Sequence, residues 1–263
     1  MDVKRNLTLL AIGGIDPTGG AGLCVDVRVA HAFGLHARVV PTCLTVQGRY
    51  GFERAEAVDA ALLRSMLDVA WREGPVQAIK IGLCTELATV AVLADWLASS
   101  THDEVPVVLD PVLFATAGGM RANAELVGAL RTRLLPLTTV VTPNLDELEI
   151  LGAGGGPLAL LRLGALAVVV KGGHAAGAEV VDLLVWSGGQ HAVRHERIGI
   201  GPVRGTGCAF ATAFASTLAL GKSHADALAR ASAFVTAGLR RTRPSADGLP
   251  VPLELPLSCP ATA

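Results

Sequence analysis

Aromatic side chains are scarce in this sequence. Phe, Tyr and Trp together supply 4% of its 263 residues, although hydrophobic residues as a whole supply 51%. A core of this composition must be built from Ala, Val and Leu, which favours buried parallel strands covered by helices over an aromatic-rich sandwich. Charged residues amount to only 17%, which argues against disorder and favours a large buried core.

The chain also lacks an excess of charge and a long apolar run. Its formal net charge is −1, so the composition gives no indication of nucleic-acid or anionic-membrane binding. No apolar run approaches the ~18–20 residues that a membrane-spanning helix needs, and the N-terminus does not resemble a signal peptide. We therefore expect a cytoplasmic protein with no nucleic-acid or membrane partner.

Paired cysteines and histidine metal motifs are missing as well. The five cysteines, at positions 24, 43, 84, 208 and 259, form no CxxC pair and leave one over, so neither a disulfide framework nor a zinc site is expected. The histidines are scattered without an HExxH motif, and we expect His191 and His195 to be exposed. Gly221-Lys222-Ser223 imitates the end of a P-loop, but Ser216 stands where that motif needs Gly.

What the sequence does contain is a regular alternation of short apolar runs and helical stretches. Strands are predicted at about 7–12, 39–46, 77–82, 105–109, 139–142 and 165–170, with helices at about 23–33, 58–72, 87–98, 123–134, 144–152, from 157, from 209 and at 225–241. Residues 180–197 predict an antiparallel hairpin around Gly188-Gly189. The pattern predicts one α/β domain over residues 1–263 with a doubly wound, mostly parallel sheet, ending in a Pro-rich tail at 244–263 that is surface-hugging or loose.

The turn Gly205-Thr206-Gly207-Cys208 opens an Ala-rich helix, with Thr206 as its natural N-cap. The unpaired N–H groups and the dipole of such a helix suit a phosphate or a developing anion. Cys208 lies in the first turn, where the pKa of a thiol tends to fall. The same residues also fit an ordinary capped helix with a small buried cysteine.

Polar residues follow several of the predicted strands, namely Asp110, Asn144 with Glu147, and Lys171. Because the carboxyl ends of parallel strands meet at one edge, these residues and the 205–208 turn together predict a phosphoryl-transfer site. Carboxylates and an amide can hold Mg²⁺ through waters, a lysine can meet phosphate, and a side chain of the turn can act as base. Taken singly, each residue also has a structural explanation, as a helix-dipole partner or a solvated lysine.

The Gly-rich loop 16–22, between the first strand and its helix, is typical of nucleotide-binding α/β units, although it is neither GxGxxG nor Walker A and its glycines could be purely conformational. With this loop, the chain resembles the hydroxymethylpyrimidine and phosphomethylpyrimidine kinases of thiamin biosynthesis, in the ribokinase-like superfamily, over about residues 7–241. The resemblance rests on an ordered set of motifs: Gly14-Ile15-Asp16-Pro17-Thr18-Gly19-Gly20-Ala21-Gly22, Asp26, Gln47, Lys80-Ile81-Gly82, Asp110-Pro111-Val112, Thr142-Pro143-Asn144 with Glu147, Lys171-Gly172-Gly173-His174 and Gly205-Thr206-Gly207-Cys208.

This resemblance implies a three-layer ribokinase-like fold and a kinase that uses ATP and Mg²⁺. Its substrates would be 4-amino-5-hydroxymethyl-2-methylpyrimidine and then the monophosphate of that compound. The pyrimidine would contact Gln47 and the backbone near Gly14 and Val112, and Asp26 would accept from the exocyclic amine or anchor the pocket. A homodimer is also implied.

The resemblance assigns the phosphate end of the site as well. Asp110 and Glu147 would lie near Mg²⁺, and Asn144, Lys171 and Thr206 would contact the nucleotide. The backbone of Gly205, Thr206 and Gly207 would form the anion hole, and Cys208 would be the base towards the hydroxymethyl group.

The sequence departs from the family pattern at four places. Arg204 stands where the family has His, and would contact nucleotide phosphate or point to solvent; Gly48-Arg49 replaces Asn-Thr; Leu83 replaces a Met that covers the ring; and segment 152–164 is short. These departures bear on substrate preference. Pyridoxal or pyridoxine phosphorylation is therefore an alternative, since some pyridoxal kinases also have Cys at the turn, and a non-catalytic pyrimidine-binding module is a third possibility.

Overall fold

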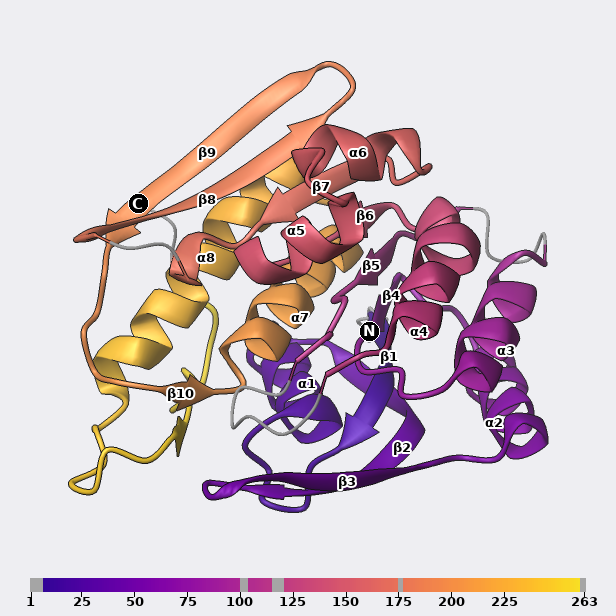
Figure 1. The fold of residues 1–263 in the computed structure, drawn as a ribbon, viewed down its shortest axis with the longest axis horizontal. Coiled ribbons are helices and arrows are strands. Elements are labelled where there is room, and N and C mark those ends of the chain that lie inside the picture. The colour runs from indigo at the N-terminus through magenta and orange to yellow at the C-terminus, as the bar shows by residue number, and fades with distance from the viewer. Residues whose placement is uncertain (1–6, 100–103, 115–120, 175–176, 261–263) are drawn as a thin grey trace, which may run out of the picture.

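A nine-stranded sheet forms the centre of the molecule (Figure 1). The computed structural model describes residues 7–99, 104–114, 121–174 and 177–260. Across the sheet the strands follow the order β3-β2-β1-β4-β5-β6-β7-β8-β9. Their bounds are β1 Thr8–Ile15, β2 His36–Gly48, β3 Gly51–Ala57, β4 Ala78–Ile81, β5 Val107–Leu109, β6 Val140–Val141, β7 Ala167–Val170, β8 Glu179–Trp186 and β9 Gly189–Glu196.

Parallel pairing dominates the sheet, as the sequence predicted. Strands β2, β1, β4, β5, β6 and β7 run parallel, while β3 is antiparallel at one edge and the β8–β9 hairpin is antiparallel at the other. The chain passes from β1 to β2 on one side and later returns to β4 on the other side of β1. At such a reversal of strand order a crevice opens beyond the carboxyl ends of the strands, which is where open α/β sheets bind ligands.

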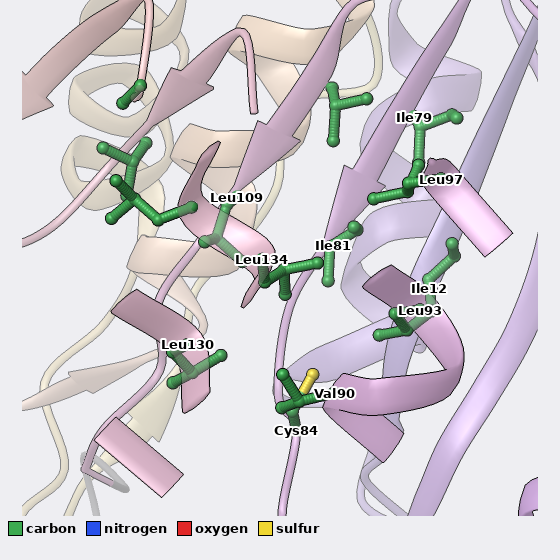
Figure 2. Close-up of a cluster of buried hydrophobic side chains, with 14 of the residues drawn as sticks. Ile12, Ile79, Ile81, Cys84, Val90, Leu93, Leu97, Leu109, Leu130 and Leu134 are labelled. Carbon is green, nitrogen blue, oxygen red and sulfur yellow. The ribbon is translucent and has the colours of Figure 1, made fainter. Parts of the chain in front are cut away.

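Helices cover both faces of the sheet, which gives three layers (Figure 1). Side chains alternate along β1, so Leu9 packs with α1, α7 and α8 on one face, whereas Leu10 and Ile12 pack with the remaining helices on the other. Figure 2 shows part of the second cluster, in which strand side chains such as Ile79 and Ile81 lie close to Leu93 and Leu97 of α3. The helix bounds are α1 Gly22–Ala32, α2 Ala60–Arg72, α3 Leu87–Leu97, α4 Ala124–Ala129, α5 Leu145–Gly152, α6 Gly156–Arg162, α7 Thr206–Ala219 and α8 His224–Arg241.

Within the main sheet and the helices that cover it, two elements differ from the sequence-based expectation. Strand β3 was not predicted, because its sequence GFERAEA has no apolar alternation and it pairs only with β2 at the sheet edge. The helix expected over 123–134 is α-helical only to Ala129 and then continues as a π turn, Leu130–Leu134, and a 3₁₀ turn, Leu135–Leu137. The other predicted elements are present with slightly shifted bounds.

The Pro-rich tail after α8 is packed against the domain rather than loose, up to residue 260; its last three residues lie outside the described part of the chain. A short strand, β11 (Val251–Pro252), pairs in parallel with β10 (Val203–Arg204), which directly precedes the Gly205 turn. Leu253 is 3% exposed and lies among the side chains of α7 and α8. The Cys259 N–H also donates to the Ala32 carbonyl at 2.9 Å.

The packing of the tail is testable by a matched pair of substitutions. Leu253→Ala should lower the free energy of unfolding by about 2–5 kcal/mol, because it leaves a cavity in a buried cluster. Leu257 lies in the same tail but is 86% exposed, so Leu257→Ala should change stability by about 0.5 kcal/mol or less. Urea unfolding of both variants measures the difference, and equal effects would mean that the tail is not anchored.

Candidate active site

One cavity of about 660 Å³ lies beyond the carboxyl ends of the strands, where the sheet order reverses. This volume is typical of sites for small molecules and cofactors. The structure brings nearly all the sequence-predicted site residues to its wall: Gly14, Gln47, Asp110, Val112, Asn144, Glu147, Lys171, Gly205, Thr206, Gly207 and Cys208. Asp26 does not line the cavity, and its position is described below.

The N-terminus of α7 forms one wall of this cavity. Gly205 is the N-cap residue and adopts φ +83°, and a Cβ at this position would collide with the Gly20 carbonyl oxygen. The prediction of Thr206 as N-cap is wrong: Thr206 is the first helical residue and its side chain makes no capping hydrogen bond. The first N–H that bonds back within the helix is that of Ala209, to the Gly205 carbonyl at 2.9 Å, so the earlier N–H groups remain available to an anion.

Lys171 lies directly in front of this helix end. A Cβ on Gly207 would be 3.4 Å from Lys171 Nζ and 3.9 Å from Asp110 Oδ2, so Gly207 lets the ammonium and the carboxylate approach the backbone. Lys171 Nζ donates to Asp110 Oδ1 at 2.7 Å and lies 3.9 Å from Glu147 Oε2. Burial lowers the pKa of Lys171, but the two carboxylates raise it by more and the net shift is upward. Lys171 therefore remains protonated at neutral pH.

Glu147 and Asn144 form a capping box at the start of α5. The Asn144 N–H donates to Glu147 Oε2 at 2.9 Å, and the Glu147 N–H donates to Asn144 Oδ1 at 2.9 Å. Both side chains therefore have a structural duty besides any contact with a ligand. Burial raises the pKa of Glu147, although Lys171 counteracts it.

The donor set fits a Mg²⁺ ion that arrives with a nucleotide. Within the described residues, His, Cys, Asp and Glu form no group of three or more able to hold a metal. Asp110 and Glu147 nevertheless flank the same ammonium of Lys171. Mg²⁺ typically binds one or two protein carboxylates and completes its shell with phosphate oxygens and water. Asp110 and Glu147 can supply these carboxylates.

Cys208 lies in the first turn of α7 and is partly buried. The expectation that its pKa falls is wrong. Burial raises the pKa of the thiol to about 11, and Asp26 and Asp110 add to the rise, whereas Lys80 lowers it by less. Desolvation of the thiolate therefore outweighs the effect of the helix end, and Cys208 carries its proton at neutral pH in the ligand-free protein.

Asp26 lies beneath the cavity rather than in its wall. It is 0% exposed, and its carboxylate accepts from Lys80 Nζ at 2.9 and 3.1 Å and from Thr212 Oγ1 at 2.7 Å. This burial and these partners favour the anchoring role of Asp26 over direct contact with the exocyclic amine of a substrate. Lys80, 1% exposed, has room for its ammonium because Gly82 carries no side chain: a Cβ there would lie 2.8 Å from Nζ. Burial lowers the pKa of Lys80, but Asp26, Cys208 and Asp110 together raise it by more, so the net shift is upward.

The residues at which the sequence departs from the family pattern contact other parts of the chain or line the cavity. Arg204 does not point to solvent: it is 4% exposed and its Nη2 lies 2.6 Å from Asp16 Oδ2. Arg49 Nη2 bonds to Asp247 Oδ1 at 2.6 Å and so links the β2–β3 turn to the tail. Leu83 lines the cavity.

Sequence reasoning missed a polar network at the far wall of the cavity. Asp182 accepts from the Gly172 N–H at 3.0 Å and from Ser232 Oγ at 2.6 Å, and His195 Nε2 lies 3.4 Å away. His195 was expected to be exposed, but its side chain is 21% exposed, and the hydrogen bond with Asp182 raises its pKa. Asp182 interrupts the apolar run of β8, whose sequence is EVVDLLVW, and a single carboxylate inside such a run is the signal that could have drawn attention to it.

The role of the Lys80–Asp26 pair predicts a defined stability pattern. Lys80→Met should lower the free energy of unfolding by about 3–5 kcal/mol, because it leaves the Asp26 carboxylate buried without its cation. The double variant Asp26→Leu/Lys80→Met should recover much of this loss, since no buried charge remains. Guanidinium unfolding measures both. An Asp26→Asn variant that kept full stability but lost affinity for the pyrimidine would instead support direct contact.

Comparison with known proteins places the chain in a family. The model of the phosphomethylpyrimidine kinase family matches residues 16–249. A hydroxymethylpyrimidine/phosphomethylpyrimidine kinase from Rhizobium meliloti is 34% identical over 240 residues, which cover 88% of this chain and 89% of that protein. The bifunctional thiamine biosynthesis protein ThiED of Geobacter sulfurreducens is 33% identical over 250 residues, and the match spans 92% of this chain but 51% of that longer protein.

Solved structures support the same grouping. Phosphomethylpyrimidine kinase from Clostridium difficile 630 superimposes with a TM-score of 0.74 at 26% identity, covering 88% of this chain and 98% of that one. Pyridoxal kinase from Bacillus subtilis, solved as an ADP complex, gives a TM-score of 0.82 at 25% identity, covering 92% and 94% of the two chains. The chain therefore belongs to the phosphomethylpyrimidine kinase family and is a phosphotransferase with the ribokinase-like fold.

Proposed function

We propose that this protein transfers the γ-phosphoryl group of ATP to 4-amino-5-hydroxymethyl-2-methylpyrimidine and then phosphorylates the resulting monophosphate. The observation that carries the proposal is the meeting of Lys171, Asp110 and the N-terminus of α7 at a cavity that Gln47 also lines. One cavity thus holds a cationic phosphate end and a polar acceptor end. The names of the family relatives supply the substrate class.

The phosphate end contains the groups that phosphoryl transfer needs. The Lys171 ammonium and the free N–H groups of Thr206 and Gly207 would bind phosphate oxygens, and Asn144 lies on the same wall. Mg²⁺, held by Asp110 and Glu147 together with the nucleotide, would neutralise negative charge that develops on the transferring group. Positioning and electrostatic stabilisation supply most of the catalysis in reactions of this kind.

The acceptor end orients a polar ring. Gln47 Nε2 donates to Thr45 Oγ1 at 2.9 Å, and Thr45 Oγ1 donates to the Ile15 carbonyl at 2.8 Å. This chain of bonds fixes the Gln47 amide so that its Oε1 can accept from the amino group of the pyrimidine. The Val112 N–H is already bonded to the Asp110 carbonyl at 2.9 Å, so Val112 and Leu83 offer the ring mainly an apolar surface.

In the transfer step, the Cys208 thiol first loses its own proton to solvent, and the acceptor hydroxyl then gives its proton to the resulting thiolate. Its oxygen then forms the bond to the γ-phosphorus as the bond from that phosphorus to the ADP oxygen breaks. The helix end beside Cys208 stabilises the charge that develops on the transferring group. Cys208 thus joins the acceptor end of the cavity to the phosphate end.

Pyridoxal phosphorylation by the same machinery is a second candidate, and the similarity to the Bacillus subtilis pyridoxal kinase favours it. The sequence relatives favour the pyrimidine.

We also propose that the protein is a cytoplasmic homodimer. Val39, Leu44 and Val46 of β2 are between 37% and 55% exposed, and such an apolar strand suits contact with a second copy.

Purified protein with ATP and Mg²⁺ should convert hydroxymethylpyrimidine first to the monophosphate and then to the diphosphate, with matching release of ADP. The second candidate is compared in parallel: kcat/KM should be higher for the pyrimidine than for pyridoxal. A higher value for pyridoxal would reverse the order of the two candidates. Ligand-induced thermal stabilisation without ADP release would instead indicate a pyrimidine-binding module without catalysis.

The role of Cys208 predicts a pH profile. Since burial raises the pKa of Cys208 to about 11, the thiolate fraction of the wild type should grow about tenfold per pH unit between about pH 7 and pH 9, and kcat should rise with it. Cys208→Asp, with a carboxylate that is already ionised, should give a flatter profile. Cys208→Ala should lower kcat by at least ~10²-fold with little change in the KM of the pyrimidine.

Cys259→Ala is the matched control for this profile, because Cys259 is also partly buried but lies outside the cavity. It should retain the wild-type rate and the wild-type pH dependence. A nearly active Cys208→Ala variant would move the role of base to another group.

A further inference from the structure

Arg204 and Asp16 form a buried ion pair between the loop after β1 and the turn before α7. The Arg204 side chain is 4% exposed and the Asp16 side chain 0%, with 2.6 Å between Nη2 and Oδ2. Arg204 Nη1 also donates to Thr18 Oγ1 at 3.2 Å. The two residues are 188 positions apart in the sequence, so this contact joins distant parts of the chain at the edge of the cavity.

The Asp16 carboxylate has two structural duties. Its Oδ1 accepts from the Thr18 N–H at 2.9 Å and from Thr18 Oγ1 at 2.8 Å, which folds loop 16–22, while its Oδ2 holds Arg204. The Asp16 carbonyl further accepts from the Gly19 N–H at 3.0 Å. One buried side chain thus fixes the shape of the loop and ties the loop to Arg204.

The backbone of the loop touches the anion-binding turn itself. A Cβ on Gly205 would collide with the Gly20 carbonyl, and a Cβ on Gly20 would lie 3.5 Å from Arg204 Nη1 and 3.4 Å from Pro252 Cβ. On its other side Arg204 is held by the tail, since the Leu253 N–H donates to the Arg204 carbonyl at 3.0 Å. Arg204 is therefore held by its side chain to the loop and by its backbone to β11.

The loop also reaches the acceptor end of the cavity. Ile15 and Gly22 form an antiparallel bridge, and a Cβ on Gly22 would collide with the Gly14 carbonyl. Gly14 lines the acceptor end and Gly205 begins the phosphate end. The same short loop lies between them, so its shape sets the separation of the two ends.

We infer that Arg204 is a positioning residue: with Asp16 it fixes the 205–208 turn relative to the acceptor end of the cavity, and it acts through this turn rather than by binding phosphate. Arg204 lines the cavity, but its side chain is 4% exposed, and each of its terminal nitrogens already donates to Asp16 or Thr18. Displacement of a reacting group by about 1 Å can cost ~10²-fold in rate, so rigidity at this turn matters for kcat. The kinetic part of this inference rests on the proposed function.

The test compares Asp16→Asn, Arg204→Gln and the double variant. Each single variant should lower kcat by about 10- to 100-fold and change the KM of ATP by less than about 3-fold. The loss in the double variant should be no greater than that of the worse single variant, because the two residues act as one unit. Hydrogen exchange at the amides of residues 209–212, the first hydrogen-bonded turn of α7, should be faster in each single variant than in the wild type, whether or not the substrate assignment is right.

Two controls separate positioning from stability and charge. Leu67→Ala removes a fully buried side chain of α2 on the opposite face of the sheet; it should lower Tm but keep kcat and the exchange rates at residues 209–212. Arg64→Gln breaks the exposed pair with Asp68 and should leave all three readouts unchanged. If Arg204→Gln is poorly folded, Arg204→Lys keeps the buried charge and should recover stability with part of kcat.

Two results would overturn the inference. A large rise in the KM of ATP for Arg204→Gln, with a benign Asp16→Asn, would show direct contact with phosphate. If both single variants keep the wild-type kcat and exchange rates and lose only Tm, the Asp16–Arg204 pair contributes to stability alone and does not position the turn. If the wild type transfers no phosphate at all, the proposed function fails, while the exchange measurement still decides whether the pair fixes the turn.

Discussion

Burial of charge at one edge of the sheet is the constraint on which this site depends. Three ion pairs lie there, Asp26–Lys80, Asp110–Lys171 and Asp16–Arg204, with anionic side chains 0–2% exposed and cationic ones 1–12%. A charge taken out of water is tolerated only where a partner and further hydrogen bonds meet it. Each pair joins segments far apart in sequence, so the same contacts that satisfy the charges also bring the cavity walls together.

From the sequence we could predict that the site lies at the carboxyl edge of the sheet, but not which charged residues pair with one another there. Carboxyl ends of parallel strands meet, so Asp110, Asn144 and Lys171 could be placed at one site from their positions after apolar runs. Nothing local indicates that Lys80 pairs with a residue 54 positions away, or Arg204 with one 188 positions away. For that reason the prediction for Asp26 stayed divided between substrate contact and anchoring of the pocket, and the prediction for Arg204 between phosphate and solvent.

The secondary structure was likewise predictable where an element depends on its own sequence, and not where it depends on pairing with a distant segment. Short apolar runs predicted the parallel strands and helical periodicity predicted the helices, because those elements bury their own apolar side chains. Strand β3 is stabilised by pairing with β2, and β11 by pairing with β10, so neither has a pattern of its own to detect. The predicted direction of the Cys208 pKa shift was wrong for a related reason. The position of Cys208 at a helix end can be recognised in the sequence, whereas the burial that raises its pKa cannot.

The surrounding carboxylates also explain what a cysteine offers at position 208. Asp26 and Asp110 both raise the pKa of its thiol, so an additional fixed negative charge at this place would face the same repulsion. A thiol is neutral at rest and so adds no charge to a crowded anionic edge. In the proposed mechanism, Cys208 acts as a base only in its thiolate form. The cost of making the thiolate then forms part of the barrier to transfer, and the Lys80 ammonium below and the helix end beside it oppose that cost.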